Sequence, residues 1–117
     1  MYNSNCEQWE KQKHVHELTG STGFVTEENE CHNHRFCTVS DEAMEKGNSH
    51  VHKVKFRTDF TDGHFHEFCG ETGPAISVGN GKHVHFLKAV TEAADGHKHK
   101  LQVATLIEDP TKFERCD

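Results

Sequence analysis

Apolar and polar residues alternate at six places along the chain, and each of these places contains the motif His-x-His. Because neighbouring residues of a β-strand point to opposite faces, the two histidines of a motif share one face. The residue two positions after the second histidine lies on that face too, and it is apolar in every copy: Leu18, Phe36, Val54, Phe68, Leu87 and Leu101. The residue directly after the second histidine lies on the other face, and five of the six are charged: Glu17, Arg35, Lys53, Glu67 and Lys100, with Phe86 as the exception. The alternation therefore predicts strands whose histidines point inward, together with the apolar residues.

The motifs occur in pairs, and the pairs divide the chain into repeated units. The two motifs are 18 residues apart in the first pair and 14 apart in the other two, where Asp62-Gly63 and Asp95-Gly96 lie between them. Asp-Gly between alternating segments is a strong signal for a β-hairpin. We therefore predict one all-β domain built from three repeated hairpin units of about 33–36 residues, a repeat architecture. The predicted boundaries are an N-terminal arm over 1–13, a domain over 14–107 with units 14–49, 50–82 and 83–107, and a tail over 108–117.

Composition limits what such a domain can do. Only 32% of the residues are hydrophobic and the mean hydropathy is -0.83, so the apolar core is thin and a further cross-link is expected. The net charge of -6 and the lack of a basic stripe argue against a nucleic-acid partner. No apolar run has the length of a membrane helix, and the N-terminus lacks the apolar region of a signal peptide. We therefore expect neither a nucleic-acid nor a membrane partner.

Every histidine of the chain belongs to one of the motifs, whereas random placement would give on the order of one such pair. An inward-facing imidazole needs partners for both ring nitrogens, because an unsatisfied buried polar group costs about 1–3 kcal/mol. A metal ion supplies one of these partners. We therefore predict that all twelve are metal ligands: His14, His16, His32, His34, His50, His52, His64, His66, His83, His85, His97 and His99.

The number of motifs that converge decides which metal would fit. Two motifs would make a four-nitrogen site for zinc or copper, whereas three would make an octahedral six-imidazole site that suits Fe(II), Ni(II) or Co(II) better than zinc. Threefold convergence can come from three chains or from the three units of one chain. We favour a homotrimer, because a spacing of 18 against 14 would spoil the register of an internal threefold. Fe(II) is the expected metal, with nickel, cobalt or zinc as alternatives.

The segment HVHFLKAVTEAADGHKH resembles the His-x-His units of trimeric phage tail-fibre tips. The resemblance implies that each motif meets its two symmetry copies around a threefold axis and that six histidines hold one iron. It also implies a fibre or filament as the form of assembly.

Over its whole length the chain also resembles the YmaF-like family of Gram-positive bacteria. The segments CHNHRF, GNSHVH, TGPAISVGNGKHVHF, DGHKH and ATLIEDPTKF carry this resemblance. It implies no established activity. With no signal peptide in view, we expect synthesis in the cytoplasm, with later assembly at a spore or cell surface as one option.

The five cysteines form an odd set, so at least one thiol is free or pairs with another chain. Cys6 and Cys116 lie near the ends, outside the repeats. Cys37 and Cys69 occupy equivalent positions, three residues after a second histidine, on the expected outer face. We predict that these four form disulfides between chains. Cys31 beside His32 is the one sequence-adjacent arrangement of a thiol and a base.

Three functions are compatible with this pattern. The favoured one is a structural protein in which buried six-histidine sites cross-link a β-rich trimer or fibre-like assembly. The first alternative is a metal storage or sensing protein, and the second is a cupin-like metalloenzyme. We expect no enzyme, because a saturated six-histidine site leaves no open position for substrate.

Overall fold

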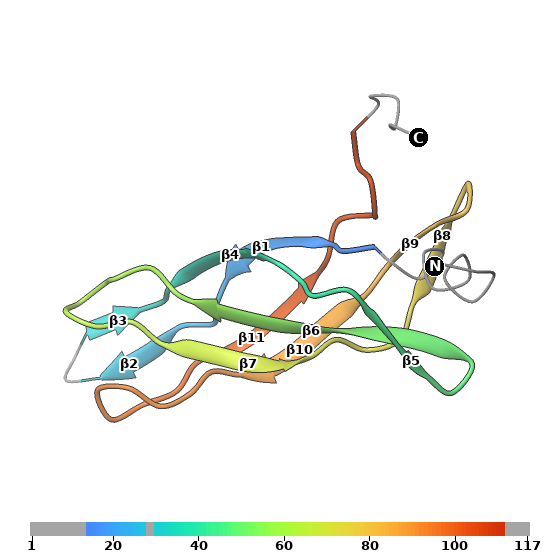
Figure 1. The fold of residues 1–117 in the computed structure, drawn as a ribbon. Helices are drawn as coiled ribbons and strands as arrows, with labels where there is room; N and C mark the ends of the chain where they lie inside the picture. Colours follow the sequence, from blue (N-terminus) through green and yellow to red (C-terminus); the bar gives the residue numbers. More distant parts are fainter. Residues whose placement is uncertain (1–13, 28–29, 112–117) are drawn as a thin grey trace, which may run out of the picture.

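The computed structural model describes residues 14–27 and 30–111, and this part of the chain is built from strands alone (Figure 1). The strands are β1 Glu17–Ser21, β2 Val25–Glu27, β3 Glu30–His32, β4 Arg35–Val39, β5 Ala43–Lys46, β6 Ser49–Arg57, β7 Glu67–Glu71, β8 Ile76–Gly79, β9 Lys82–Val84, β10 Phe86–Val90 and β11 Lys100–Ala104. The all-β class predicted from the alternation is therefore confirmed. None of the described residues forms a helix that could cross a membrane.

Three antiparallel strand pairs form the body of the molecule, and each strand that builds them carries a His-x-His motif at its start or directly before it. The first strand pair is β1–β4, the second is β6–β7 and the third is β10–β11. Because the strands of a pair are antiparallel, the two motifs of a pair lie at opposite ends. One end of the body therefore carries motifs one, three and five, and the other end carries motifs two, four and six.

Backbone hydrogen bonds join the three strand pairs into a closed ring. The amide of Asp59 donates to the carbonyl of Arg35 at 2.9 Å, which links the second pair to the first. The amide of Gly73 donates to the carbonyl of Phe86 at 2.8 Å, which links the second pair to the third. The amide of Leu106 donates to the carbonyl of Glu17 at 2.9 Å, which links the third pair to the first. The result is a three-sided β-prism formed by one chain, and its walls are the pairs β1–β4, β6–β7 and β10–β11 (Figure 1).

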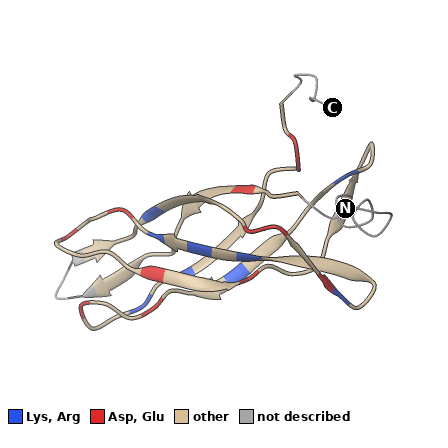
Figure 2. Ribbon diagram, in the orientation of Figure 1, with Lys and Arg blue, Asp and Glu red and all other residues tan. Residues whose placement is uncertain are grey.

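The interior of the prism is a small apolar layer between its two ends. All six apolar residues predicted to point inward are buried, with exposed fractions from 1 to 6%: Leu18, Phe36, Val54, Phe68, Leu87 and Leu101. Phe56 adds a stack, with its ring centroid 4.4 Å from that of Phe36 and 5.3 Å from that of Phe68. Gly70 makes room for this stack, because a Cβ there would lie 2.7 Å from the Cζ of Phe68. All six residues predicted for the opposite face are exposed, and Figure 2 shows charged positions along the strands of the prism.

The first strand pair absorbs its longer motif spacing without losing register. In the second and third pairs, isolated bridges at Thr61↔His64 and Ala94↔His97 lie just before two-residue turns. In the first pair, β2 and β3 pair Val25 with His32 at the equivalent place and add two further residue pairs beyond it. Four extra residues, two on each strand, preserve both the alternation and the pairing. Our expectation that a spacing of 18 would spoil an internal threefold is therefore wrong.

Two arms extend the prism at the end where motifs three and five lie. β5 pairs with the first part of β6, and β8 pairs with β9, so that both connectors between strand pairs double back as antiparallel strands. The turns use left-handed backbone, with φ of 62° at Gly47 and 56° at Asn80. Glycine and asparagine tolerate that region, which explains Gly47 in the first connector and Asn80 in the second.

Candidate metal centre

The twelve histidines form two clusters, one at each end of the prism. The first histidine cluster consists of His14, His16, His50, His52, His83 and His85, and one ligand atom from each lies within 4.8 Å of all the others. The second histidine cluster consists of His32, His34, His64, His66, His97 and His99, of which five meet the same distance criterion. The sixth, His66, brings its Nε2 to 3.2 Å from the Nε2 of His97. All twelve predicted ligands are therefore gathered in two groups of six.

The spacing of the Nε2 atoms fits an octahedron. In the first histidine cluster, the Nε2 of His83 lies 3.0 Å from that of His14, 3.1 Å from that of His50 and 3.1 Å from that of His16. Neighbouring ligands of a regular octahedron are about 1.4 times the metal–ligand distance apart, so these spacings correspond to bonds of about 2.2 Å, close to the about 2.0–2.1 Å of zinc–histidine bonds. Opposite ligands would then be about 4.4 Å apart, which agrees with the limit of 4.8 Å.

Each motif contributes one inner and one outer histidine. The inner histidines are the second of each motif, and all are at most 1% exposed: His16, His34, His52, His66, His85 and His99. The outer histidines are the first of each motif: His14, His32, His50, His64, His83 and His97. With the exception of His32, they are only partly buried.

A backbone carbonyl accepts a hydrogen bond from the Nδ1 of every inner histidine. The acceptors, in the order of the inner histidines, are the carbonyls of Leu106, Asp59, Asp41, Glu92, Gly73 and Gly23, at 2.8 to 3.1 Å. Each acceptor belongs to a neighbouring strand pair, so these bonds also hold the walls together. A carbonyl can only accept, so the ring proton is on Nδ1 and the Nε2 of each inner histidine carries a lone pair.

Where the Nδ1 proton is committed to an acceptor, the converging Nε2 atoms are therefore acceptors that face each other without protons between them. His66 donates through Nδ1 to Glu92, and His97 donates through Nδ1 to the carbonyl of Asp95, yet their Nε2 atoms lie 3.2 Å apart. The Nε2 atoms of His52 and His85 are buried and have no hydrogen-bond partner in the described part of the chain. Buried, unsatisfied lone pairs directed at one point fit a cation at that point.

A hydroxyl residue six positions after each inner histidine completes the repeat, and our sequence interpretation missed it. These residues are Thr22, Ser40, Thr58, Thr72, Thr91 and Thr105, all at most 5% exposed. The hydroxyl of each accepts the backbone N–H of an inner histidine across the strand pair, as Thr72 does for His52 at 3.2 Å. The amide of each donates to the carbonyl of the same histidine, as Thr72 does to His52 at 2.9 Å. A constant spacing of six in all six copies was the signal that could have identified them.

Carboxylates approach several of the outer histidines. The Oε2 of Glu108 lies 3.2 Å from the Nδ1 of His83, and its Oε1 accepts the backbone N–H of His83 at 3.0 Å. The Oδ2 atoms of Asp62 and Asp95 lie 3.5 Å from the Nδ1 atoms of His32 and His64. Burial raises the pKa of Glu108, but the His83 backbone bond and the nearby charges of His83 and Lys82 outweigh it and leave the pKa below its usual value.

The environment keeps most of the imidazoles neutral. Burial is the main cause, and mutual repulsion among the rings adds to it. The pKa is lowered to about 3 for His52 and to about 4 for His14, His50, His85 and His99. The pKa values of His16, His32 and His66 are lowered as well, with burial again the largest cause. Neutral imidazole is the form that binds metal, so the clusters are ready to bind near pH 7.

The clusters correct our expectation that each motif would meet two copies of itself from other chains. Motifs one, three and five of the same chain form the first histidine cluster, and motifs two, four and six form the second. Three different motifs therefore take the place of three identical ones. The physical reason is the ring of backbone hydrogen bonds, which closes the prism within one chain.

The thiols stand apart from the clusters. Cys31, Cys37 and Cys69 are free and exposed, and the outer face predicted for Cys37 and Cys69 is where they lie. Cys6 and Cys116 lie outside the described residues. The disulfides between chains stay a prediction.

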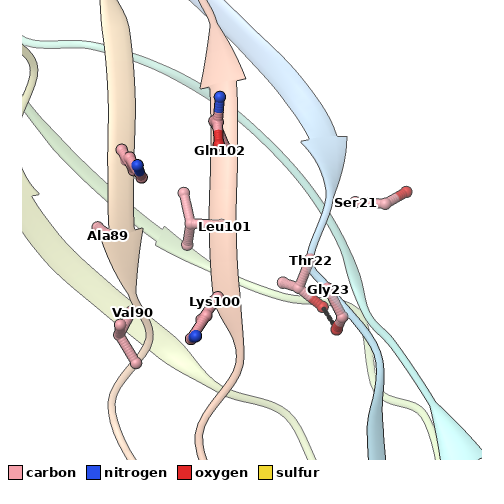
Figure 3. A pocket seen from close by; sticks show the side chains of 9 residues that line it. Ser21, Thr22, Gly23, Ala89, Val90, Lys100, Leu101 and Gln102 are labelled. Atoms are coloured by element: carbon pink, nitrogen blue, oxygen red, sulfur yellow. Dashed lines mark hydrogen bonds between the residues drawn. The ribbon is translucent and has the colours of Figure 1, made fainter.

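A groove lies on the side of the prism. It has a volume of about 670 Å³ and runs along β10 and β11 beside the segment that follows β1 (Figure 3). Its lining includes Lys88, Val90, Lys100 and Gln102, and none of its described lining residues is a histidine. The groove does touch Thr22 and Gly23, which form hydrogen bonds with His34 and His99.

Fold and site together define a class: an all-β protein whose chain gathers its histidines into two groups with metal-binding geometry. Residues 11–107 match the family model YmaF, described as spore germination protein GerY/YamF, and the chain belongs to this family. The resemblance inferred from the sequence is thereby confirmed. No curated protein and no solved structure shows significant similarity to the chain.

Proposed function

We propose that the protein is a structural metal-binding protein in which two octahedral six-histidine sites, one at each end of a three-unit β-prism, cross-link the walls of the fold. The single observation that carries the proposal is the commitment of every inner Nδ1 proton to a backbone carbonyl, which leaves six inner Nε2 lone pairs directed into the two clusters. Two cations would satisfy these lone pairs and would bind each wall of the prism to the other two.

The ligand set also supports a choice of metal. Six imidazole nitrogens in octahedral spacing suit Fe(II), Ni(II) or Co(II), whereas zinc in structural sites is almost always tetrahedral. We propose Fe(II) as the ion, with Ni(II) or Co(II) as substitutes of the same geometry. A site filled by six protein nitrogens has no open position, so we propose a structural role and no catalytic one.

A thin apolar layer makes such cross-links valuable. Eight apolar side chains are buried among the described residues, and a core of that size supplies little stability on its own. Each ion would join three walls that are otherwise held by backbone hydrogen bonds, by the bonds from the inner Nδ1 atoms to carbonyls and by this layer. We propose that metal binding and folding are coupled, as in other small metal-stabilised domains.

Assembly and cellular role are further proposals. The family description names spore germination, and a metal-stabilised, non-catalytic domain fits a structural component of the spore. We further propose that the protein associates with itself, as a homotrimer or a longer polymer. Because one chain supplies all ligands of both sites, that association would use outer surfaces, where Cys37 and Cys69 are available for cross-links.

X-ray absorption on protein purified without a histidine tag tests the site directly. We expect about six nitrogen ligands at about 2.2 Å around the resident metal, as the octahedral spacing requires. Four ligands, or oxygen ligands from water in half of the positions, would contradict the proposal. A substrate-dependent change in this coordination would instead favour a metalloenzyme.

A further inference from the structure

Carboxylates lie near the Nδ1 atoms of three outer histidines, and two outer rings, His64 and His97, have a carbonyl acceptor at Nδ1 as the inner rings do. Every inner ring donates to a carbonyl from a neighbouring strand pair, and one of them, His34, also has the Oδ1 of Asp59 at 3.4 Å from its Nδ1. Three outer rings face a carboxylate from a distant segment. Asp62 approaches His32, Asp95 approaches His64 and Glu108 approaches His83. We propose that these three carboxylates are positioning residues that set the metal affinity of the two sites separately, Glu108 for the first histidine cluster and Asp62 with Asp95 for the second. This inference rests on the proposed function.

The charge of a filled site gives the carboxylates their importance. A divalent ion held by six neutral imidazoles keeps both of its positive charges, and its neighbours in the apolar layer cannot offset them. A carboxylate at Nδ1 offsets part of that charge, fixes the ring tautomer and makes Nε2 a stronger donor to the metal. Loss of such a partner typically lowers metal affinity about 10–100-fold.

Glu108 is the best placed of the three. It is 14% exposed, both of its carboxylate oxygens contact His83, and its backbone carbonyl accepts a bond from the Nζ of Lys82 at 3.2 Å. Three carbonyls accept hydrogen bonds from the inner rings of the first histidine cluster. Those of Asp41 and Gly73 belong to residues just before the two arms, whereas that of Leu106 belongs to the segment that carries Glu108. Glu108 therefore brings a charge to the first site from the segment that follows the last strand.

Asp62 and Asp95 occupy the turns of the second and third strand pairs, and acidic positions mark both turns in Figure 2. Each carboxylate reaches a histidine of another strand pair, so the two contacts run around the prism in one direction. Both residues have left-handed backbone, with φ of 55° and 54°. Asparagine shares the tolerance of aspartate for this conformation, so Asp→Asn removes the charge and keeps the turn.

The experiment is a chelator challenge of the full-length protein loaded with Ni(II), with ions per chain counted by native mass spectrometry. Glu108→Gln should release one ion at a chelator strength about 10–100-fold lower than wild type needs, and the double variant D62N/D95N should also release one ion early. The triple variant should release both ions early, because the carboxylates serve different sites. Glu42→Gln is the matched control, since Glu42 is exposed in the segment that follows β4 and its side chain contacts none of the described histidines.

The outcomes separate this inference from the proposed function. Variants that hold both ions as firmly as Glu42→Gln would overturn the inference alone. A triple variant that releases only one ion early would overturn the assignment to separate sites. A wild-type protein that takes up no Ni(II) would instead contradict the proposed function. Circular dichroism of every loaded variant before the challenge excludes a general loss of fold.

Discussion

The inner and outer histidines have the same side chain and the same motif, yet they are held in different ways. His52, an inner ring, is 0% exposed, donates to the carbonyl of Asp41 and has its backbone amide bound by Thr72. His50, the outer ring of the same motif, is partly exposed, and its Nε2 contacts those of His14 and His83. The inner rings therefore belong to the framework of the prism, and the outer rings close the coordination sphere over them. A separation of two residues on one strand is therefore enough to give the two histidines these different roles.

Removal of the metal should have the largest effect, because it leaves both sets of rings without their common partner. We expect protein stripped under denaturing chelation and refolded to lose about 4 kcal/mol or more of stability, the linkage value for free metal at about 1,000 times its dissociation constant. Thermal unfolding followed by circular dichroism measures this. Restoring the metal should restore the melting temperature, and an unchanged melting temperature in metal-free protein would argue for ordinary packed histidines.

Substitutions within one motif should show that an inner histidine contributes more to stability than an outer one. His52→Ala leaves a cavity in the buried wall and an unpaired carbonyl at Asp41, whereas at His50 water can enter the vacated position. We expect His52→Ala to cost about 2–4 kcal/mol more than His50→Ala. Denaturant unfolding with metal analysis of the same samples measures the difference. Equal losses for both variants would remove the distinction between framework and closing rings.

Acid should lower the stability of the fold through both the inner and the outer histidines. Unfolded histidines take up protons near pH 6.5, but the folded pKa is about 3 for His52 and about 4 for His50. Between these limits the unfolded state binds more protons, so stability falls as the pH drops from about 6.5 toward 4 and is flat above about pH 7.5. Metal binding also weakens as the pH falls, because protonated imidazole cannot bind a metal ion. A free energy of unfolding that is constant from pH 7 to pH 5 would contradict these pKa directions.

The smallest effect should come from the hydroxyl residues that support the inner rings. Thr72→Val keeps the shape of the side chain but removes the acceptor of the His52 amide, which should cost about 1–3 kcal/mol. Thr38→Val is the matched control, because Thr38 is a threonine whose hydroxyl donates at an exposed position to the carbonyl of Lys55. A loss at Thr72 no larger than at Thr38 would show that the buried hydroxyls are not needed to hold the inner rings.

Alternation was sufficient to predict the strands, the inward face and all twelve clustered histidines, because period-two patterning acts locally along each strand. It could not predict how the strands close. The bonds that close the prism join residues far apart in the chain, such as Gly23 to Lys100, and they are made by backbone atoms that the side-chain pattern does not reveal. The carbonyl partners of the inner rings were hidden for the same reason.

Our expectation of homotrimeric coordination rested on one inference that is wrong. A spacing of 18 was taken as incompatible with two spacings of 14, although an even number of added residues lengthens a strand pair at its tip and leaves the register unchanged, as at Val25↔His32. The threonine spacing, in contrast, was visible in the sequence and overlooked. A search for repeats of half a unit, beginning at each motif, would have found it.

Native mass spectrometry combined with metal analysis is the most direct test of whether one chain forms two complete six-histidine sites. We expect the smallest folded species to be a single chain carrying two transition-metal ions. Any larger assembly should contain two ions per chain and should separate into such monomers when reductant breaks its disulfides. Single folded chains without metal, or ions that are present only in trimers and are lost when the trimer dissociates, would contradict this expectation.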